Sequence, residues 1–441
     1  QVLMIKKLRF YARFVVVCLL LNMRELVSEL LGELDTLVDQ YTQTFKPVDA
    51  QEWSLVLQEI VNFLAADKPL IITGTSAPPM SFRMKYLPPG EEGEDHHTKC
   101  TLQEAILVGH AQAQDKFSEL TLDMFRFLQV LERQPGVEGA SAAMEPAGDK
   151  ERDRLGRKRA NPHKYLLYRP GYGTFMTVLA TTFKELREGA AILLYLSVDG
   201  LKPDGEDEDT ETVGYPGYSQ GGVLLGSQGP DDTPAEEVDG EAAAPTRETA
   251  PTSAGPNYHC LHPADLIPFT RKPFFLVVDS DNASAFTDAP NVFGEPFVRL
   301  LSPAARPHDL HIPGMSGSVM TLFLHSSITA FARVVGLDSI EYGTLNEARR
   351  LLDTRFSEIL QLLKAAPDLA PSYVRFLDDE FLAELVLRFI FCHAVLANHL
   401  DYTKPVDPCT EGLAIAHGTP VPCTLHVAHT RCRRWRWSWR G

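Results

Sequence analysis

The stretch that decides the fold is HCLHPADLIPFTRKPFFLVVDSDNASAFTDAPNVFGEPFVRLLSP, residues 259–303. Within it, Phe274–Val278 (FFLVV) is an unbroken apolar run between a proline and the polar residues DSDN. Such a run is typical of a strand buried on both faces of a sheet. Asp281 or Asn282 is suited to N-cap a short helix after it, and Phe297–Leu301 (FVRLL) is predicted to be the next strand. The order strand, short crossover, strand indicates a parallel α/β sheet.

Similar runs precede this stretch and extend the predicted sheet. Three short β-like segments are Tyr165–Tyr168 (YLLY), Ile192–Ser197 (ILLYLS) and Val223–Leu225. Between the first two, residues 174–187 place their apolar side chains on one helical face and are predicted to form a helix. We therefore expect a Rossmann-like parallel α/β domain over residues 163–400, completed by helices at its C-terminal end.

Those C-terminal helices follow from two apolar stripes with helical spacing. One stripe lies within residues 345–363, and the other runs through Phe381, Leu385, Phe389, Cys392 and Leu396. Glu384 and Arg388 form an i,i+4 pair on the second. The apolar run Met320–Leu324 (MTLFL) fits either a strand or a buried helix.

The N-terminal part, residues 1–133, is predicted to be an α-helical scaffold. Residues 3–66 have apolar side chains at every third or fourth position, interrupted at Pro47. Residues 101–132 are also predicted to be helical, because Phe117, Leu120, Met124, Phe127 and Leu131 follow a 3-4-3-4 spacing typical of a packed helix. The chain begins with Gln1 inside a helical pattern, so we expect the natural N-terminus to be missing.

Polar and charged segments separate these regions. Residues 134–162 are predicted to be a basic linker, residues 202–257 a disordered acidic insert, and residues 401–441 a divergent, disordered tail. The formal net charge of −16 argues against non-specific nucleic-acid binding by the whole chain. No apolar run reaches the length of a membrane span, which needs about 20 residues.

Asp279 and Asp281 follow a predicted strand, where α/β proteins place metals and ligands. With Gly171–Thr174 nearby, they would suit a metal- or nucleotide-dependent α/β enzyme. Two carboxylates are too few for a Mg²⁺ site without further ligands, so capping and loop chemistry is the favoured role. Gly171-Tyr172-Gly173 lacks a P-loop lysine and is predicted to be a turn. No nucleophile elbow, P-loop or dinucleotide-binding glycine motif is present, so we expect no catalytic residue and no cofactor.

Two groups of cysteine and histidine are candidate metal ligands. Cys409, Cys423, His426, His429 and Cys432 have spacings that fit no common zinc finger. His259, Cys260 and His262 are closer together, but a hydrogen-bonding role for the histidines is favoured. The seven scattered cysteines indicate reduced thiols. No metal is expected.

The basic patch Lys150–Lys164 admits two functional roles and one structural role. It is a candidate nuclear localisation signal or phosphate-binding patch, or else a solvated linker. A chromatin-bound scaffold would use the same residues. The residues that would carry either role are Arg154, Arg157, Lys158, Arg159 and Lys164.

Several long blocks of this sequence resemble the protein SCAI (suppressor of cancer cell invasion) family. They are RFYARFVVVCLLLNMRELV, NPHKYLLYRP, HCLHPADLIPFTRKPFFLVVDSDNAS, FGEPFVRLLSP and FLDDEFLAELVLRFIFC. They follow the family order and cover roughly residues 5–400. The residues that carry the resemblance include His259, His262, Pro263, Arg271, Lys272, Pro273, Asp279, Ser280, Phe381, Arg388 and Cys392.

This resemblance implies a nuclear transcription cofactor rather than an enzyme. It implies a corepressor that binds other proteins and restrains transcription driven by myocardin-related factors with serum response factor, and thereby cell migration. The family is also linked to DNA double-strand-break repair. We accordingly expect transcription factors or cofactors as partners, together with chromatin or repair proteins, and no direct sequence-specific contact with nucleic acid. The expected location is the nucleus, with a cytoplasmic fraction.

Overall fold

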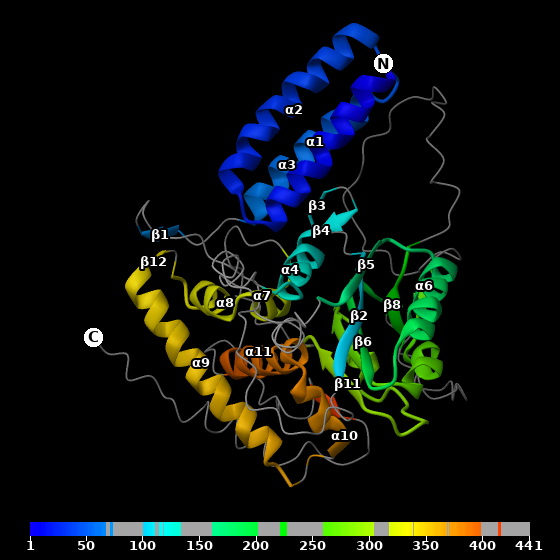
Figure 1. The fold of residues 1–441 in the computed structure, drawn as a ribbon, viewed down its shortest axis with the longest axis vertical. Helices are drawn as coiled ribbons and strands as arrows, with labels where there is room; N and C mark the ends of the chain where they lie inside the picture. The colour runs from blue at the N-terminus through cyan, green and yellow to red at the C-terminus, as the bar shows by residue number, and fades with distance from the viewer. Residues whose placement is uncertain are drawn as a thin grey trace, which may run out of the picture.

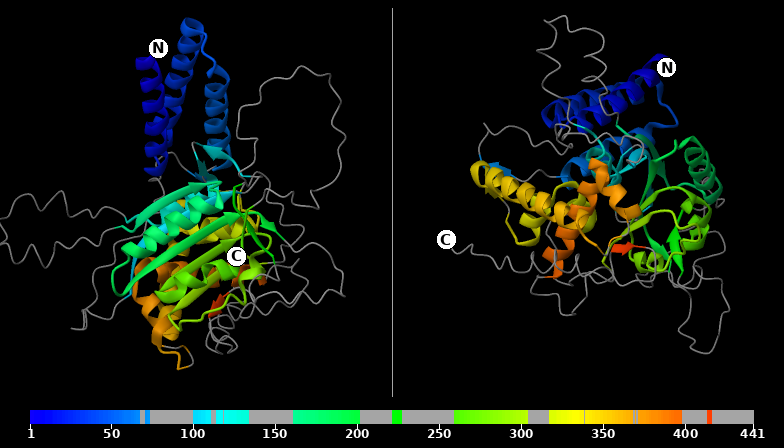
Figure 2. Two further views of the ribbon diagram at one scale, coloured as in Figure 1. Left: turned by 90° about the vertical axis from the view of Figure 1, so that its right-hand side faces the viewer. Right: turned by 60° about the horizontal axis from the view of Figure 1, so that its bottom comes forward.

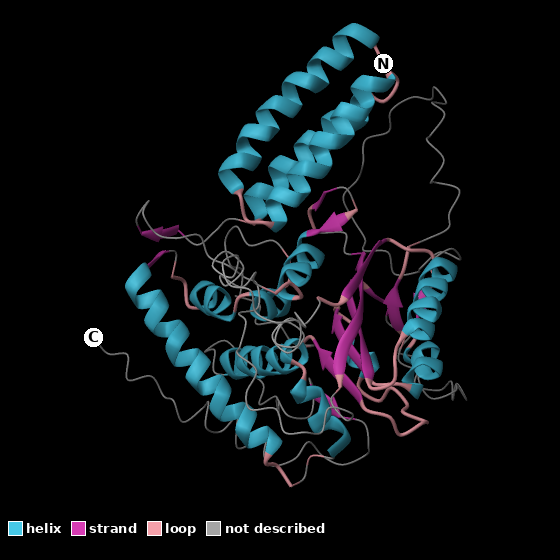
Figure 3. Ribbon diagram, viewed as in Figure 1, coloured by secondary structure: helices cyan, strands magenta, loops and turns pink. Residues whose placement is uncertain are grey.

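A parallel sheet with helices on both faces forms the centre of the molecule, and three N-terminal helices extend from one end of it (Figures 1 and 3). These features come from a computed structural model. It describes residues 1–67, 71–73, 100–110, 114–117, 119–133, 161–201, 221–226, 259–303, 317–337, 339–367, 369, 371–397 and 413–415.

The central sheet has six strands, five of them parallel. Its order is β13-β11-β10-β6-β2-β5, and only the edge strand β13 is antiparallel. The strands are β2 (Thr101–His110), β5 (His163–Tyr168), β6 (Ala190–Val198), β10 (Phe274–Asp279), β11 (Phe297–Leu301) and β13 (Leu413–Ile415). The parallel α/β sheet predicted from the sequence is confirmed.

The five parallel strands are doubly wound. Taken in chain order, β2, β5, β6, β10 and β11 occupy the spatial order 2-1-3-4-5, a common doubly wound order. The chain leaves β2 for β5 on one side and then returns to β6 on the other. The carboxyl ends of β2 and β6 therefore flank the point where the winding direction reverses.

Each face of this sheet is buried under its own helices. On β6, Leu193 and Tyr195 contribute to one core, whereas Leu194 and Leu196 contribute to the other, because successive side chains of a strand point to opposite faces. The first core includes α4 (Leu122–Val130), α7 (Val319–His325) and α11 (Glu380–Ala397). The second includes α6 (Tyr172–Glu185) and the 3₁₀ helices η4 (Pro263–Arg271) and η5 (Ala283–Phe286). Figure 1 shows α6 on the opposite side of the sheet from α4, α7 and α11.

The N-terminal region is a bundle of three helices, α1 (Val2–Leu20), α2 (Arg24–Phe45) and α3 (Ala50–Ala66). The chain turns between α1 and α2 at Asn22, whose φ of 58° is left-handed. Asparagine tolerates this conformation better than most residues do. The bundle packs on the sheet domain through Phe63 of α3, whose ring lies 5.0 Å from that of Phe125 of α4. An ion pair between Arg24 and Asp67 ties α2 to the end of α3.

The C-terminal helices form an outer layer. After α7 come α8 (Ser327–Val334), α9 (Tyr342–Lys364), the short α10 (Pro371–Val374) and η6 (Arg375–Asp378), and then α11. Phe391 of α11 contacts the rings of Phe323 in α7 and Phe356 in α9, so aromatic packing links the layer. The predicted C-terminal helices are confirmed. Met320–Leu324 lies in α7, so the buried-helix alternative holds for that run.

Three smaller sheets complete the described structure. β1 (Ile71–Thr73) pairs in parallel with β12 (Ser339–Glu341), and β3 (Lys116–Phe117) pairs with β4 (Leu120–Thr121) as a hairpin. The third sheet has the antiparallel order β7-β8-β9, comprising β7 (Gly200–Leu201), β8 (Gly222–Leu224) and β9 (Cys260–Leu261).

The helix predicted over residues 101–132 is wrong at its start. Thr101–His110 forms β2, which lies in the sheet between β5 and β6, and only Leu122–Val130 is helical. Of the apolar stripe predicted there, Phe117 and Leu120 lie in the β3–β4 hairpin, although both are buried. The apolar run of β2 is buried on both faces, so it lacks the alternation that would identify a strand. The sheet therefore begins at residue 101, within the region that was predicted to be helical.

Parts of the predicted linker, insert and tail fall outside the described residues, and the predicted domain boundaries stay predictions. Within the insert, residues 221–226 are described and carry β8, as expected for Val223–Leu225. Within the tail, Leu413–Ile415 forms a strand on β11, which differs from the predicted disorder at these three residues. Among the described helices, none is both long enough and apolar enough to cross a bilayer.

We predict that Leu194→Ala destabilises the protein by about 3 kcal/mol, since it removes a fully buried side chain from the central strand β6. Leu166→Ala on the edge strand β5, where the side chain is 41% exposed, is the matched control and should cost less than about 1 kcal/mol. Urea unfolding followed by circular dichroism measures both. Equal losses would contradict this assignment of centre and edge.

Candidate functional site: the carboxyl edge of the sheet

Open α/β sheets bind ligands outside the carboxyl ends of their strands, at the point where the winding reverses. In this protein the carboxyl ends of β2, β6 and β10 carry His110, Ser197 and Asp279. All three residues are buried. This edge is therefore the first place to look for a ligand site.

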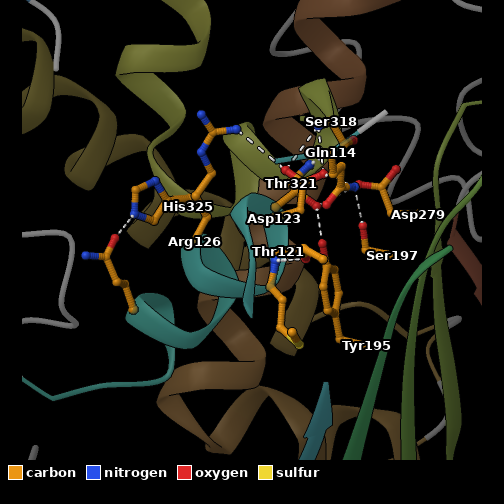
Figure 4. Close-up of polar contacts among 12 residues, drawn as sticks. Gln114, Thr121, Asp123, Arg126, Tyr195, Ser197, Asp279, Ser318, Thr321 and His325 are labelled. Carbon is orange, nitrogen blue, oxygen red and sulfur yellow. Dashed lines mark hydrogen bonds and ion pairs between the residues drawn. The ribbon is translucent and has the colours of Figure 1, made fainter. Parts of the chain in front are cut away.

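A chain of hydroxyl groups occupies the edge at Asp279 (Figure 4). The Thr321 hydroxyl of α7 donates to Asp279 Oδ2 at 2.6 Å, and Tyr195 Oη lies 2.7 Å from Thr321 Oγ1. Because threonine has one hydroxyl hydrogen, Tyr195 must donate to Thr321 when Thr321 donates to Asp279. Burial, and then the nearby Asp123 and Asp279, raise the pKa of Tyr195 well above its usual value, so the phenol keeps the proton that it donates.

A second buried carboxylate, Asp123, lies at the N-termini of two helices. It belongs to the first turn of α4, and both of its oxygens accept from the backbone N–H of Ser318, the N-cap of α7, at 3.0 and 2.9 Å. Helix N-termini favour negative charge, so α4 and α7 together stabilise this carboxylate. Arg126 Nη1 lies 3.5 Å from Asp123 Oδ1 and supplies a buried counter-charge.

Gln114 links Asp123 to the sheet. Its side-chain amide donates to Asp123 Oδ2 at 2.6 Å and to Ser197 Oγ at 2.8 Å (Figure 4). Gly317, just before the N-cap of α7, has a φ of 85°, and a Cβ there would lie 2.5 Å from Asp123 Oδ1. Only glycine brings the backbone this close in that conformation.

These contacts engage the two carboxylates at this edge in hydrogen bonds to the chain's own groups. Asp123 and Asp279 both bond to α7, so the arrangement can hold α4, α7 and the sheet in one register. Burying carboxylates is tolerated when their hydrogen bonds are satisfied in this way. Within the described ranges, no group of three or more His, Cys, Asp or Glu residues is placed to hold a metal ion.

Asp281 lies in a different environment from Asp279. Its Oδ1 accepts from the Gly200 N–H at 2.5 Å, whereas Asp279 bonds to Thr321. Loop chemistry therefore holds for Asp281, but Asp279 joins a strand to a helix rather than capping a loop. The two aspartates share no partner among these contacts.

Ser280 and Asn282 also bind neighbouring segments. Ser280 N donates to Ser302 Oγ, and Ser302 Oγ donates to Ser280 O, which joins the ends of β10 and β11. Asn282 occupies the N-cap position of η5, but its side-chain amide donates to the carbonyls of Leu201 and Gly222 at 2.9 and 3.2 Å instead. The DSDN segment thus fastens β7 and β8 to the edge of the sheet.

The histidines of the sequence motif make hydrogen bonds, as favoured from the sequence. His259 Nδ1 accepts from the Tyr172 N–H at 3.2 Å, at the start of α6. His262 Nδ1 lies 3.0 Å from the Gly221 carbonyl oxygen, and the backbone N–H of His262 donates to the Asp265 carboxylate. The turn predicted at Gly171–Gly173 is wrong, because Gly171 is the N-cap of α6 and the helix begins at Tyr172.

Two basic residues of the family blocks close helix C-termini. Lys272 Nζ donates to the carbonyls of Phe183 and Leu186 at the end of α6, at 3.1 and 2.8 Å. Arg388 donates to the carbonyls of Leu324 and His325 at the end of α7, at 2.6 and 3.0 Å. It also forms the predicted i,i+4 pair with Glu384, at 2.8 Å. Cations are favourable at helix C-termini, so both residues have a structural role here.

The remaining motif residues pack or make single contacts. Pro273 is buried and its carbonyl accepts from Ile192 N, Pro263 starts η4, and Arg271 lies over the Phe293 ring. Phe381 and Cys392 are buried in α11. Burial raises the pKa of Cys100 to about 12 and that of Cys260 to about 11, so neither thiol is a ready nucleophile near neutral pH.

Most of the basic patch lies outside the described residues, and so do all five candidate zinc ligands of the C-terminal tail. These are Arg154, Arg157, Lys158, Arg159, Cys409, Cys423, His426, His429 and Cys432. Lys164 is described, and its Nζ forms an ion pair with Glu132 Oε1 at 2.7 Å. The structure thus places Lys164 in a contact with the end of α4 rather than in a free basic surface.

Sequence reasoning missed Asp123, Thr321 and Tyr195. The available signals were N-cap residues: Thr121 and Ser318 each precede an apolar run and accept from the backbone three residues later. Those signals predict where α4 and α7 begin. They do not predict that the two helix starts meet at one carboxylate.

Comparison with known proteins gives one consistent family. The family model described as Protein SCAI matches residues 1–402. Protein SCAI of Mus musculus is 40% identical over 405 residues, covering 91% of this chain and 64% of the mouse protein. Protein SCAI of Homo sapiens is 40% identical over 400 residues, covering 90% and 63%. Protein SCAI homolog of Dictyostelium discoideum is 32% identical, covering 91% and 70%. The chain thus spans less than two thirds of the mouse and human relatives.

We predict that Thr321→Val lowers the free energy of unfolding by about 3 kcal/mol, because the buried Asp279 and Tyr195 both lose a hydrogen-bond partner at almost unchanged side-chain volume. The matched control is Thr181→Val on the exposed face of α6, where the hydroxyl bonds only to its own helix, at Thr177 O. Urea unfolding measures both variants. A Thr321→Val loss no larger than the control's would show that the hydroxyl chain does not hold α7.

Stability should also fall on acidification because of His325. Burial lowers the pKa of His325 well below its usual value, and Arg126, Arg388 and Arg24 lower it further. The unfolded chain therefore binds a proton below about pH 6.5 that the folded chain does not, so the contribution present above that pH is lost as the pH falls. We expect His325→Gln to remove about 1 kcal/mol of the stability difference between pH 7 and pH 5.5. His163→Gln, at an exposed histidine, is the control; an unchanged pH difference in His325→Gln would contradict the assignment.

Proposed function

This chain belongs to the SCAI family, and from that premise we propose that it is a nuclear transcription cofactor that acts by binding other proteins rather than by catalysis. In this proposal it is a corepressor that restrains transcription driven by myocardin-related factors with serum response factor, and so restrains cell migration. A role in double-strand-break repair is the extension of the same proposal. Because the chain spans less than two thirds of the mouse and human relatives, these are proposals for the chain and not properties carried over from whole proteins.

The observation that carries the proposal is that the aspartates at the carboxyl edge of the sheet bond to the chain's own groups. In an α/β enzyme this edge would present side chains to a substrate. Here Asp279 bonds to Thr321, Asp123 bonds to Ser318 and Gln114, and Asp281 bonds to Gly200. These side chains already join parts of the chain to one another, which supports a structural role for the edge.

The acidic insert is connected to the same edge of the sheet. Residues 202–220 and 227–258 hold thirteen Asp and Glu residues, against Lys202 and Arg247. Both segments connect to the β7-β8-β9 sheet, which Asn282 fastens to the end of β10. Such a concentration of charge on a fixed base is suited to electrostatic recognition of basic partner surfaces. The helical bundle α1–α3 offers a second kind of surface.

A reporter assay separates this proposal from the enzyme hypothesis. We expect the chain to lower transcription from a serum-response-factor reporter in cells, and Asp281→Asn to repress as strongly as the unaltered chain. Asparagine keeps an oxygen that accepts from Gly200 N–H but removes the charge that metal or acid–base chemistry at Asp281 would need. Thermal unfolding of the purified variant checks that the fold is intact.

Loss of repression by a folded Asp281→Asn would favour the enzyme hypothesis instead. Affinity capture from nuclear extract is the second arm of the test. Failure to recover any transcription or repair factor would count against the cofactor function.

A further variant tests the chromatin role of the basic patch. It carries Arg157→Ala/Lys158→Ala/Arg159→Ala and is captured at rising salt. Loss of nuclear entry without loss of DNA binding would identify a localisation signal.

A further inference from the structure

The first helix of the chain exposes an apolar stripe that is interrupted by one lysine, Lys7. One face of α1 is buried against the bundle through Leu8, Ala12, Val15, Cys18 and Leu19. The other face leaves large apolar side chains in solvent, with exposed fractions of 81% at Leu3, 61% at Phe10, 37% at Phe14, 47% at Val17 and 48% at Leu21. The rings of Phe10 and Phe14 stack on each other at 5.8 Å. Apolar surface arranged in this way marks an interaction site.

The spacing of the stripe is that of a helix–helix seam. Positions 3, 7, 10, 14, 17 and 21 follow one another at alternating steps of four and three residues, as the a and d positions of a heptad do. Lys7 is the only polar residue among them. A single lysine at a seam position selects a partner that offers an acceptor opposite it, at a cost in stability.

The charges around the stripe are of one sign on α1. The helix carries Lys6, Lys7, Arg9 and Arg13 and no aspartate or glutamate. On its other border the Tyr11 hydroxyl donates to Glu33 Oε2 of α2 at 2.7 Å, so that carboxylate is already engaged. Among the charged side chains of α1, a partner helix would therefore meet only cations.

The bundle α1–α3 stands away from the sheet domain at one end of the molecule, and α1 forms one side of it (Figure 2). The helix has 19 residues, enough for two to three heptads of contact.

We propose that α1 binds one acidic amphipathic helix of a partner protein, which packs apolar side chains at heptad spacing between Phe10, Phe14 and Val17 and places a carboxylate opposite Lys7. This inference rests on the proposed function as an interaction protein and names its binding surface. The partner's flanking residues are Glu or Asp, which face Lys6 and Arg13. Recognition is of the helix-in-groove type, with specificity set by charge.

Two other occupants fit the observations less well. A second copy of α1 would bring no carboxylate to Lys7, because α1 has none. A bilayer surface suits a helix with a wide apolar face, whereas this stripe is the width of a coiled-coil seam and the opposite face of α1 is buried in the bundle. A protein helix satisfies both the spacing and the charge.

The test measures binding of a fluorescein-labelled synthetic peptide to the full chain. The peptide has about three heptads, with leucine at the a and d positions. It carries glutamate on both flanks and at the position opposite Lys7. Fluorescence anisotropy measures binding. We expect Phe10→Asp/Phe14→Asp to weaken binding at least tenfold, because it places charge in the apolar seam. Leu55→Asp/Val61→Asp on the exposed face of α3 is the matched control, with the same number of exposed apolar side chains replaced by the same charge, and should bind as the unaltered chain does.

A charge exchange tests the role of Lys7 directly. Lys7→Glu should weaken binding of the acidic peptide about tenfold, and a peptide with lysine at the opposing position should restore it. Affinity for the acidic peptide should also fall as salt rises, because the rim charges are exposed. Circular dichroism of each variant confirms that the bundle is folded.

Several results would overturn the proposal. One is that the chain binds a peptide with lysine flanks as tightly as the acidic peptide, and another is that the two double variants bind the acidic peptide equally well. A third is that the chain forms a dimer and Phe10→Asp/Phe14→Asp abolishes it. A fourth is that the chain binds phosphatidylserine vesicles more tightly than it binds the peptide. Protection of Phe10 from solvent in a longer form of the protein, with no peptide bound, would do the same. If nuclear extract yields the same transcription factors with Phe10→Asp/Phe14→Asp as with the unaltered chain, the α1 proposal fails while the cofactor function stands. If it yields none with either, the function fails independently of the peptide result.

Discussion

The arrangement of this protein depends on two buried carboxylates that must be satisfied inside the fold. Asp123, in the first turn of α4, accepts from the N-cap N–H of α7, and Asp279 accepts from the hydroxyl of Thr321 in the first turn of α7. A buried carboxylate without partners is far more costly than one that accepts several hydrogen bonds. The position of α7 therefore fixes the position of α4 and of the end of β10 together.

Polar side chains also satisfy backbone groups at the ends of other helices and strands. Lys272 closes α6, Arg388 closes α7, and Asn282 holds the base of the insert through two carbonyls. Residues that stand out in the sequence as motif residues thus satisfy backbone groups that would otherwise be buried without partners. Their prominence reflects the architecture. The interaction surfaces that we propose are different ones, namely the outside of the bundle and the acidic sequence of the insert.

The sequence was a reliable guide where its pattern had a period and a poor one where it did not. The sequence predicted the strands at residues 165–168, 192–197 and 297–301 and the helices α6, α9 and α11. Short apolar runs between turn residues indicate strands, and apolar stripes with a period of 3.6 residues indicate helices. Strand β2 was not, since a strand buried on both faces shows the same continuous apolarity as a buried helix. The favoured hydrogen-bonding role of His259 and His262 was predicted, whereas the partners of Asp279 were not.

By itself the sequence determined the fold class and the family. It also determined the stripe on α1, which is a property of spacing along one helix. Only the tertiary structure decided that Thr101–His110 lies in the sheet, that Asp123 and Asp279 are bound to α7, and that Phe10, Phe14 and Val17 of α1 are exposed in the described part of the chain. The physical reason is that periodicity and capping act within a few residues, whereas the partner of a buried polar group is set by segments as far apart as Asp123 and Ser318, which meet only when the chain is folded.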